Sequence, residues 1–407
     1  MDANAQASRP SRAIQPQPSL AGRLVRGTLR LLIPAAITAV AAFLGYAYAV
    51  YPIWYHVDQV RRTEVLGGFI PGGRQEALRA YYEDDSLTPD SLDRVVWAVR
   101  TVMTPFVDYG AAPGQWYNAT IDAYQFRGSR KLVMPKPPGV TRIFLTGASV
   151  AFSAGAPNDE RTIGGYLQRL LDQRGAASGE HFEVFTFATP AWSSTHERIG
   201  IENRLSELQP DLVISLTGAG DALYGERGHN VLWARALTDQ YYWDLVNLAL
   251  ERAGFSPMTD VQDVSPDPVP PELVAQRLRK NVLLGANALA LAQARYQVFL
   301  QPAVVTTGKP LSEREKMLRF GPTGYFKNAE YYTRTYAEID RALMEPLPAN
   351  TTYANLSGVF DPLPAAQDVF LDGYHFADRG NELIAKAMVA ALPARLAPQP
   401  LAAGATP

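Results

Sequence analysis

The chain has 407 residues, of which 47% are hydrophobic and 19% charged, so it can form one large or two modest globular domains. The formal net charge of −2 and the lack of a basic stripe argue against nucleic acid as a partner. The absence of cysteine excludes disulfides, thiolate metal sites and a cysteine nucleophile.

The N-terminus has the pattern of a membrane anchor. Residues 1–30 contain five arginines and one acid and predict a basic cytoplasmic tail, disordered over residues 1–19. Residues 31–55 carry no charge and end in a cluster of tyrosines with one tryptophan. A helix needs about 20 apolar residues to cross a bilayer, and basic residues stay on its cytoplasmic side. We predict a single span of the cell inner membrane over 31–55, with the rest of the chain periplasmic.

A second interpretation of the same segment stays open. Ala47-Tyr48-Ala49 fits the small-x-small cleavage site of a signal peptide, in which case the apolar helix would be removed. The aromatic group at the far end of the segment favours the anchor, because such rings prefer the membrane interface.

The remaining chain divides at a proline-rich stretch. Residues 56–140 form an N-terminal extracytoplasmic segment, in which the apolar spacing predicts a helix over 91–103. From 141 to 396, strand-like and helix-like runs alternate, which predicts an α/β fold: a three-layer α/β/α sandwich with a mainly parallel sheet. An aromatic and proline-rich stretch at about 222–294 is predicted to be a cap insertion, and residues 397–407 a disordered tail. The strand-like runs are 142–145, 183–187, 211–216 and 295–300, and the helical runs are 162–171, 197–208 and 381–392.

Two short motifs carry chemistry. Ser149 follows an apolar strand-like run in Gly147-Ala148-Ser149, and Asp372 lies three residues before His375. A serine needs a base to become a nucleophile, and a histidine is the better base when a carboxylate fixes its tautomer. Each motif alone is common in turns, but active sites of parallel sheets lie at the carboxyl ends of the strands. We therefore expect these side chains to meet there.

At these residues the chain resembles the SGNH (GDSL-like) hydrolase family, and in particular its membrane-anchored bacterial branch. Ser149 matches the first block of the family, Gly218-Ala219-Gly220-Asp221 the third and Asp372-x-x-His375 the last. The resemblance covers roughly residues 141–393 and implies a flavodoxin-like sheet. It implies Ser149 as nucleophile, His375 as base and Asp372 as the residue that orients His375. The backbone N–H groups of Ser149 and Ala188 would donate to the oxyanion.

Two positions depart from the family pattern. Ala188 replaces a glycine, and Gly220 replaces an asparagine whose side chain would donate to the oxyanion. Losing one such donor costs about 10²–10³ in rate. A Gly220 backbone N–H, a water or the side chain of Asn158 would have to fill the gap. If the family comparison holds, Gly220→Asn is expected to raise activity.

The resemblance implies a periplasmic serine esterase or O-acyltransferase that acts on ester-linked acyl groups. An acetylated cell-envelope or secreted polysaccharide is the expected substrate, and polysaccharide-assembly proteins are the expected protein partners. We expect no cofactor and no metal, because the paired His, Asp and Glu spacing of zinc sites is absent. A weakly active binding or scaffold component, favoured by Gly220, and a general lipolytic esterase are the alternatives. His196 is expected to be a surface or helix-capping residue.

Overall fold

The structure is a computed structural model that describes residues 19–61, 101–116, 119–229, 237–258, 265, 267–320, 328–376 and 378–396. The predicted disorder of residues 1–18 and 397–407 lies outside the described residues. Two compact units are present, Met1–Val57 and Asp58–Pro407.

The first unit is dominated by helix α1, Leu20–Ala49, which begins within the predicted basic tail and ends before the predicted end of the span. Its apolar part, Gly27–Ala49, has 23 residues and mean hydropathy 1.8. At 1.5 Å per residue this part is about 35 Å long, enough to cross a hydrocarbon core of about 30 Å. A turn at Val50 divides the aromatic group predicted to end the span: Tyr46 and Tyr48 lie in α1, and the other three residues lie in helix α2, Tyr51–Arg61.

The second unit is built on a parallel five-stranded sheet with the order β6-β5-β7-β8-β9. This is the flavodoxin-like order, and it confirms the predicted fold class. The predicted strands are β5 (Val140–Gly147), β6 (His181–Ala188), β7 (Leu212–Thr217) and β8 (Arg295–Leu300). The sequence prediction missed β9, Thr351–Asn355, an edge strand with only one fully buried residue.

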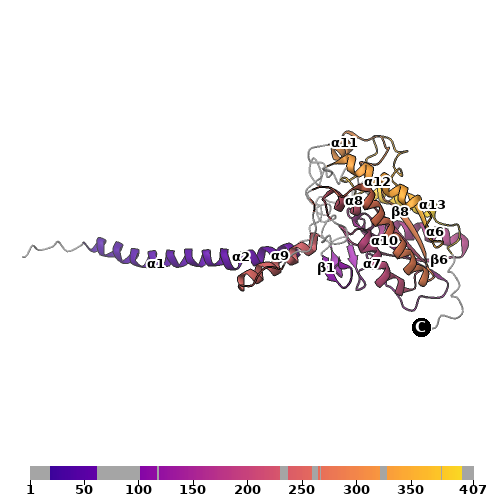
Figure 1. Ribbon diagram of the computed structural model, residues 1–407. Helices are drawn as coiled ribbons and strands as arrows, with labels where there is room; N and C mark the ends of the chain where they lie inside the picture. The colour runs from indigo at the N-terminus through magenta and orange to yellow at the C-terminus, as the bar shows by residue number, and fades with distance from the viewer. Residues whose placement is uncertain are drawn as a thin grey trace, which may run out of the picture. The chain divides into compact units, whose positions relative to one another are not determined.

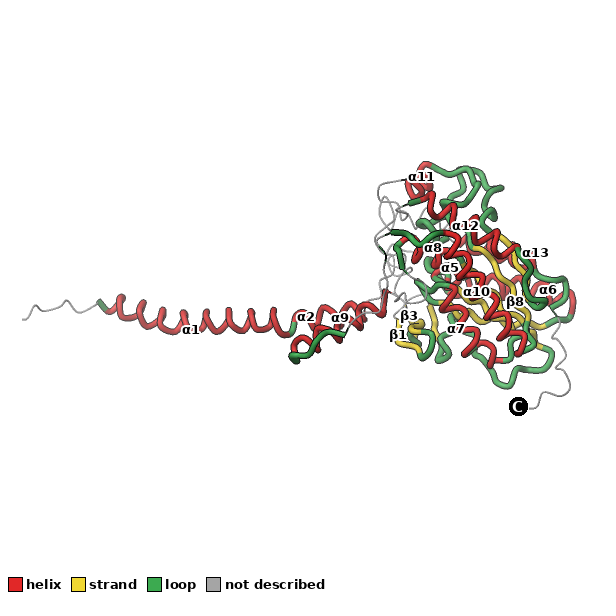
Figure 2. Tube along the Cα trace, viewed as in Figure 1, coloured by secondary structure: helices red, strands yellow, loops and turns green. Residues whose placement is uncertain are grey.

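Helices cover the sheet in two layers (Figures 1 and 2). In one layer α6, Ile163–Ser178, packs against α13, Asp378–Ala391. In the other, α10 packs against α7 and α12, and α8 packs against α10 and α12. The bounds of this second layer are Ser194–Asn203 (α7), Ala219–Glu226 (α8), Pro271–Leu291 (α10) and Ala329–Met344 (α12).

Helix α10 corrects the extent of the predicted cap at 222–294. It connects β7 to β8 and packs against β8 with nine buried residues, so it is a crossover helix of the sandwich and no part of a cap. The last turn of α8 and helix α9, Leu237–Arg252, are also described within that stretch.

The segment before the sheet contains two antiparallel strand pairs. Strand β1, Thr101–Thr104, pairs with β2, Asp108–Ala111, and β3, Gly114–Trp116, pairs with β4, Ala119–Ile121. The helix predicted over 91–103 is therefore wrong at residues 101–103, and its other residues lie outside the described part. The remaining helices are α5, Ser149–Phe152, and α11, Glu313–Phe320.

The core explains why the central strands are apolar runs. Every residue of β7 is buried, as expected for a parallel strand covered on both faces. Phe126, Phe144 and Phe185 stack beside β5 and β6 with ring centroids 5.4–5.7 Å apart. This packing covers the middle of β5 and β6, the two strands whose carboxyl ends lead into the candidate site.

Candidate functional site

Ser149 lies at a sharp turn from β5 into α5. Gly147, the last residue of β5, has φ +151°, and a Cβ there would collide with the Leu216 carbonyl oxygen and the Ala151 side chain. Glycine is therefore required where the turn passes the neighbouring strand β7. Ser149 is partly exposed and is the first residue of α5, so its N–H has no partner within that helix.

The structure brings Ser149, His375 and Asp372 together across 226 residues of sequence. The Ser149 Oγ lies 2.7 Å from His375 Nε2, and His375 Nδ1 lies 2.7 Å from Asp372 Oδ2. Asp372 and His375 are both buried, whereas Ser149 is accessible. The arrangement has the nucleophile–base–orienter connectivity that activates a serine hydroxyl.

A tight loop holds the acid and the base in this geometry. Asp372 Oδ1 accepts hydrogen bonds from the N–H groups of Tyr374 (2.8 Å) and His375 (2.9 Å). The Leu371 N–H donates to the His375 carbonyl at 2.8 Å, which closes the loop. The apolar run before Asp372 suggested that this loop directly follows a strand. It does not, because the last strand before it, β9, ends at Asn355.

The charge state of Asp372 follows from these contacts. Burial raises the pKa of its carboxyl, but the nearby His375 and the hydrogen bonds from His375 and Tyr374 outweigh burial, so the pKa lies below its usual range. Asp372 is therefore ionised at neutral pH and can stabilise a positive charge on His375.

Arg127 supports the turn that carries the nucleophile. Its guanidinium donates to the carbonyls of Phe152 (2.6 Å) and Ser153 (3.1 Å) at the end of α5, and pairs with Asp159 at 3.0 Å. Ser153 in turn accepts a hydrogen bond from the Ile163 N–H at 2.8 Å. Because Arg127 is buried, this contact fixes the end of α5 away from solvent.

The loop after β6 lies at the same end of the sheet as Ser149. Ala188 is buried and pairs with Gly147, and the following Thr189 N–H donates to the Gly147 carbonyl. Ala191, three residues further, has φ +64°, a conformation that favours glycine. Its N–H has no acceptor within the described part of the chain, and its carbonyl accepts from the Tyr224 hydroxyl at 2.8 Å.

Ala191 is thus a second candidate oxyanion donor beside Ala188, and the sequence prediction missed it. Its side chain has no chemistry, and only the preceding Pro190 marks the position as a turn. The Tyr109 hydroxyl holds the Pro190 carbonyl at 2.9 Å, so this loop is fixed from two sides.

The structure gives a physical reason for Gly220. It is the second residue of α8, and a Cβ there would lie well inside 3.0 Å of the Trp192 carbonyl oxygen, a distance that real Cβ atoms do not show. The loop after β6 therefore packs directly on the α8 backbone, and an asparagine at this position has no room. The adjacent Asp221 is buried and accepts from the Ser194 N–H (2.9 Å) and Oγ (2.5 Å), which ties α8 to the same loop.

Two other residues considered from the sequence have structural contacts. Asn158 is exposed and accepts from the Arg161 N–H at 3.0 Å, so it caps a short 3-10 helix. His196 accepts from the Ser193 N–H at 3.1 Å at the start of α7, so it caps this helix, and it is buried and not on the surface.

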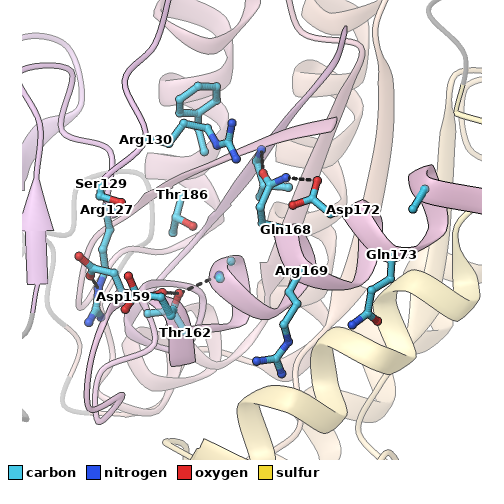
Figure 3. A pocket seen from close by; sticks show the side chains of 17 residues that line it. Arg127, Ser129, Arg130, Asp159, Thr162, Gln168, Arg169, Asp172, Gln173 and Thr186 are labelled. Atoms are coloured by element: carbon cyan, nitrogen blue, oxygen red, sulfur yellow. Dashed lines mark hydrogen bonds and ion pairs between the residues drawn. The ribbon is translucent and has the colours of Figure 1, made fainter. Parts of the chain in front are cut away.

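A pocket of about 700 Å³ lies beside the edge strand β6 (Figure 3). Arg127, Asp159, Gln168 and Thr186 are among its lining residues, and none of the three residues Ser149, Asp372 and His375 is. Gln168 bonds the Phe182 carbonyl and the Val184 N–H, and so covers part of the exposed edge of β6. Across the described ranges, no three His, Cys, Asp or Glu side chains are grouped as metal ligands.

Comparisons with known proteins give similarity at the level of solved structures. No protein-family model and no curated protein matches the sequence. The acetyl xylan esterase AlAXEase is 13% identical, with a TM-score of 0.39 over 62% of this chain and 100% of that chain. Axe2, an acetylxylan esterase from Geobacillus stearothermophilus, is 11% identical (TM-score 0.36; 62% and 95% covered). TesA is 15% identical (TM-score 0.34; 63% and 100% covered).

Proposed function

We propose that the chain is a membrane-anchored serine esterase or O-acyltransferase that acts on ester-linked acyl groups. The observation that carries the proposal is the continuous chain of hydrogen bonds from Ser149 through His375 to Asp372, each 2.7 Å long. Burial of an ionised carboxylate costs free energy. Nucleophilic catalysis explains this cost, because the carboxylate orients a histidine that contacts an accessible serine.

In the proposed mechanism, Ser149 Oγ attacks the acyl carbonyl while His375 Nε2 takes the hydroxyl proton. The tetrahedral intermediate collapses to an acyl-Ser149 ester, and His375 returns the proton to the leaving alcohol. Water or an acceptor hydroxyl then attacks the acyl-enzyme with His375 as base again, which regenerates Ser149. Hydrolysis and transfer differ only in this second acceptor.

The proposed oxyanion donors are backbone groups. The N–H of Ser149 is free at the start of α5, and the segment from Ala188 to Ala191 would supply a second N–H from the end of β6. The Gly220 N–H lies in the first turn of α8 and has no partner within that helix, so it is available as a third donor. A set of backbone donors would replace the side-chain amide that position 220 cannot hold.

The location of the enzyme follows from α1. With Gly27–Ala49 as the span and arginines before it, the catalytic unit would lie in the periplasm. There the available acyl esters include acetylated envelope or secreted polysaccharides, and we propose these as the substrate class.

The test is the hydrolysis of p-nitrophenyl acetate by the full chain in detergent, beside Ser149→Ala and the matched control Ser178→Ala. Ser178 is exposed at the end of α6, away from the triad. Serine-dependent turnover, with fluorophosphonate labelling of wild type and Ser178→Ala only, supports the proposal. Equal rates and equal labelling in all three proteins would reject it. Adding an oligosaccharide acceptor then separates transfer from hydrolysis by its acylated product.

A second candidate function is a weakly active polysaccharide-binding component of a modification or secretion assembly. The missing side-chain amide at Gly220 favours it. Polysaccharide binding by a protein that shows no labelling of Ser149 would select this candidate.

A further inference from the structure

A buried ion pair lies next to the loop that carries Asp372 and His375. Lys309 Nζ and Glu315 Oε2 are 2.6 Å apart, and both side chains are fully buried. Glu315 Oε1 points the other way and accepts from the N–H groups of Val369 (2.9 Å) and Phe370 (3.4 Å). One carboxylate therefore joins the start of α11 to the chain just before Asp372.

The path from Glu315 to the catalytic residues is short. Phe370 is two residues before Asp372 and forms a bridge with Phe376, which directly follows His375. On the other side, the Val304 N–H donates to the Gly373 carbonyl at 3.0 Å, from the same segment that leads to Lys309. The acid–base loop is thus held at its base by Glu315 and at its tip by Val304.

A buried ion pair costs free energy of desolvation, so stability alone is a weak explanation for its presence. Removing two charges from water costs several kcal/mol per ion, and well-packed apolar residues are often as stable as the pair or more so. The two N–H groups of Val369 and Phe370 explain why a carboxylate is present, because buried N–H groups need an acceptor. That acceptor also fixes the backbone from which Asp372 projects.

We propose that Glu315 is a positioning residue for the acid–base pair, held in its rotamer by Lys309. Its Oε1 sets the position of residues 369–370, and through them the contact between Asp372 and His375. The inference rests on the proposed function. Charged groups that also face this region are Arg314 and Asp368, whose side chains lie 3.7 Å apart.

The test compares two nearly isosteric double variants of the full chain. Lys309→Met with Glu315→Gln removes both charges but keeps an oxygen acceptor for Val369 and Phe370. Lys309→Met with Glu315→Met removes the charges and the acceptor. Since the pairs differ only at that acceptor, a difference between them reports positioning and not the loss of the buried charges.

We expect the Gln pair to keep kcat within about threefold of wild type, and the Met pair to lose about 10- to 100-fold in kcat with KM unchanged, since misplacement by about 1 Å can cost that much. The downfield NMR signal of the proton between His375 Nδ1 and Asp372, assigned as the signal absent from a His375→Gln spectrum, is expected to weaken or shift in the Met pair, because a loosened carboxylate holds this hydrogen bond less firmly. Equal kcat and an equal His375 Nδ1 proton signal in the two folded pairs would overturn the proposal.

Two further measurements keep the outcome interpretable. If the Met pair does not fold, Glu315→Asp with Lys309 intact withdraws the acceptor by about one bond length and should change the His375 Nδ1 proton signal in the same direction. An unchanged signal in that variant also overturns the proposal. If wild type has no serine-dependent turnover, the proposed function fails. The NMR comparison of the Gln and Met pairs then still decides whether Glu315 positions His375.

Discussion

Glu197 provides the sharpest test of the electrostatics beneath the site. It lies on α7, is 3% exposed, and its carboxyl faces β7 close to Ser215 and Thr217. Burial, with a smaller contribution from the neighbouring Asp221 carboxylate, raises the pKa of this carboxyl from its ordinary value of 4.5 to about 8, although hydrogen bonds from the Thr217 and Ser215 hydroxyls partly offset the effect. The perturbation is Glu197→Gln, which keeps the shape of a protonated glutamic acid and cannot ionise.

The expected effect follows from the two pKa values. Between pH 4.5 and 8 the folded protein holds a proton on Glu197 that the unfolded chain has released, so stability falls as pH rises through this window. The pKa of Glu197 differs by about 3.5 between the folded and unfolded states, and one pKa unit corresponds to about 1.36 kcal/mol. The free energy of unfolding can therefore fall by at most about 5 kcal/mol. Below pH 4.5 both states are protonated, and above pH 8 both are ionised, so the Glu197 contribution becomes flat.

The assay is urea unfolding of wild type, Glu197→Gln and the exposed control Glu160→Gln at pH 5, 6.5 and 8, followed by tryptophan fluorescence. Trp192 is fully buried beside this region and reports its unfolding. The free energy of unfolding of the Glu197→Gln variant relative to wild type should rise by several kcal/mol from pH 5 to pH 8, and the control should stay parallel to wild type. A constant difference between Glu197→Gln and wild type across this range would refute the reasoning.

Three further predictions concern the site. Gly220→Asn is expected to lower the free energy of unfolding by about 1–3 kcal/mol and to reduce esterase activity, because its Cβ must displace the Trp192 carbonyl; a stable variant with raised activity in the p-nitrophenyl acetate assay would contradict this. Asp372→Asn should lower kcat by about 10⁴ with KM little changed, since the ionised carboxylate orients His375; a loss below tenfold would argue against the triad. Ala191→Gly should stabilise the protein by about 1 kcal/mol in urea unfolding, whereas Ala188→Gly, within β6, should destabilise it by about 0.5–1 kcal/mol; the reverse order would show that Ala191 is unstrained.

The sequence predicted the central part of the fold because buried parallel strands are short apolar runs. The strand expected at 295–300 has the observed bounds, and β5, β6 and β7 differ from prediction by one or two residues at each end. β9 was missed because an edge strand is only half covered and its sequence, Thr351–Asn355, is largely polar. The helix expected up to residue 103 has the apolar spacing of a helix, but residues 101–103 pair with β2.

The bounds of helix α1 differ from those of the predicted span for a related reason. Charge and hydropathy define where a helix can lie in a bilayer, but helical hydrogen bonds continue through polar residues. Helix α1 therefore begins at Leu20, among the arginines, and the turn at Val50 falls within the aromatic cluster, between Tyr48 and Tyr51.

Functional side chains can be identified from the sequence more readily than functional backbone groups. Ser149, His375 and Asp372 were identified because their side chains have distinctive chemistry, and the structure brings them within hydrogen-bonding distance. The oxyanion donors proposed for this chain are backbone N–H groups, which nearly every residue carries, so only conformation identifies them. Gly220 illustrates the consequence: the sequence makes it a missing asparagine, whereas the packing of the Trp192 carbonyl makes it a position that no side chain can occupy. The lack of the family's asparagine at position 220 is therefore evidence about the packing of the loop after β6. Whether the chain is active depends instead on the proposed backbone donors at residues 149, 188–191 and 220.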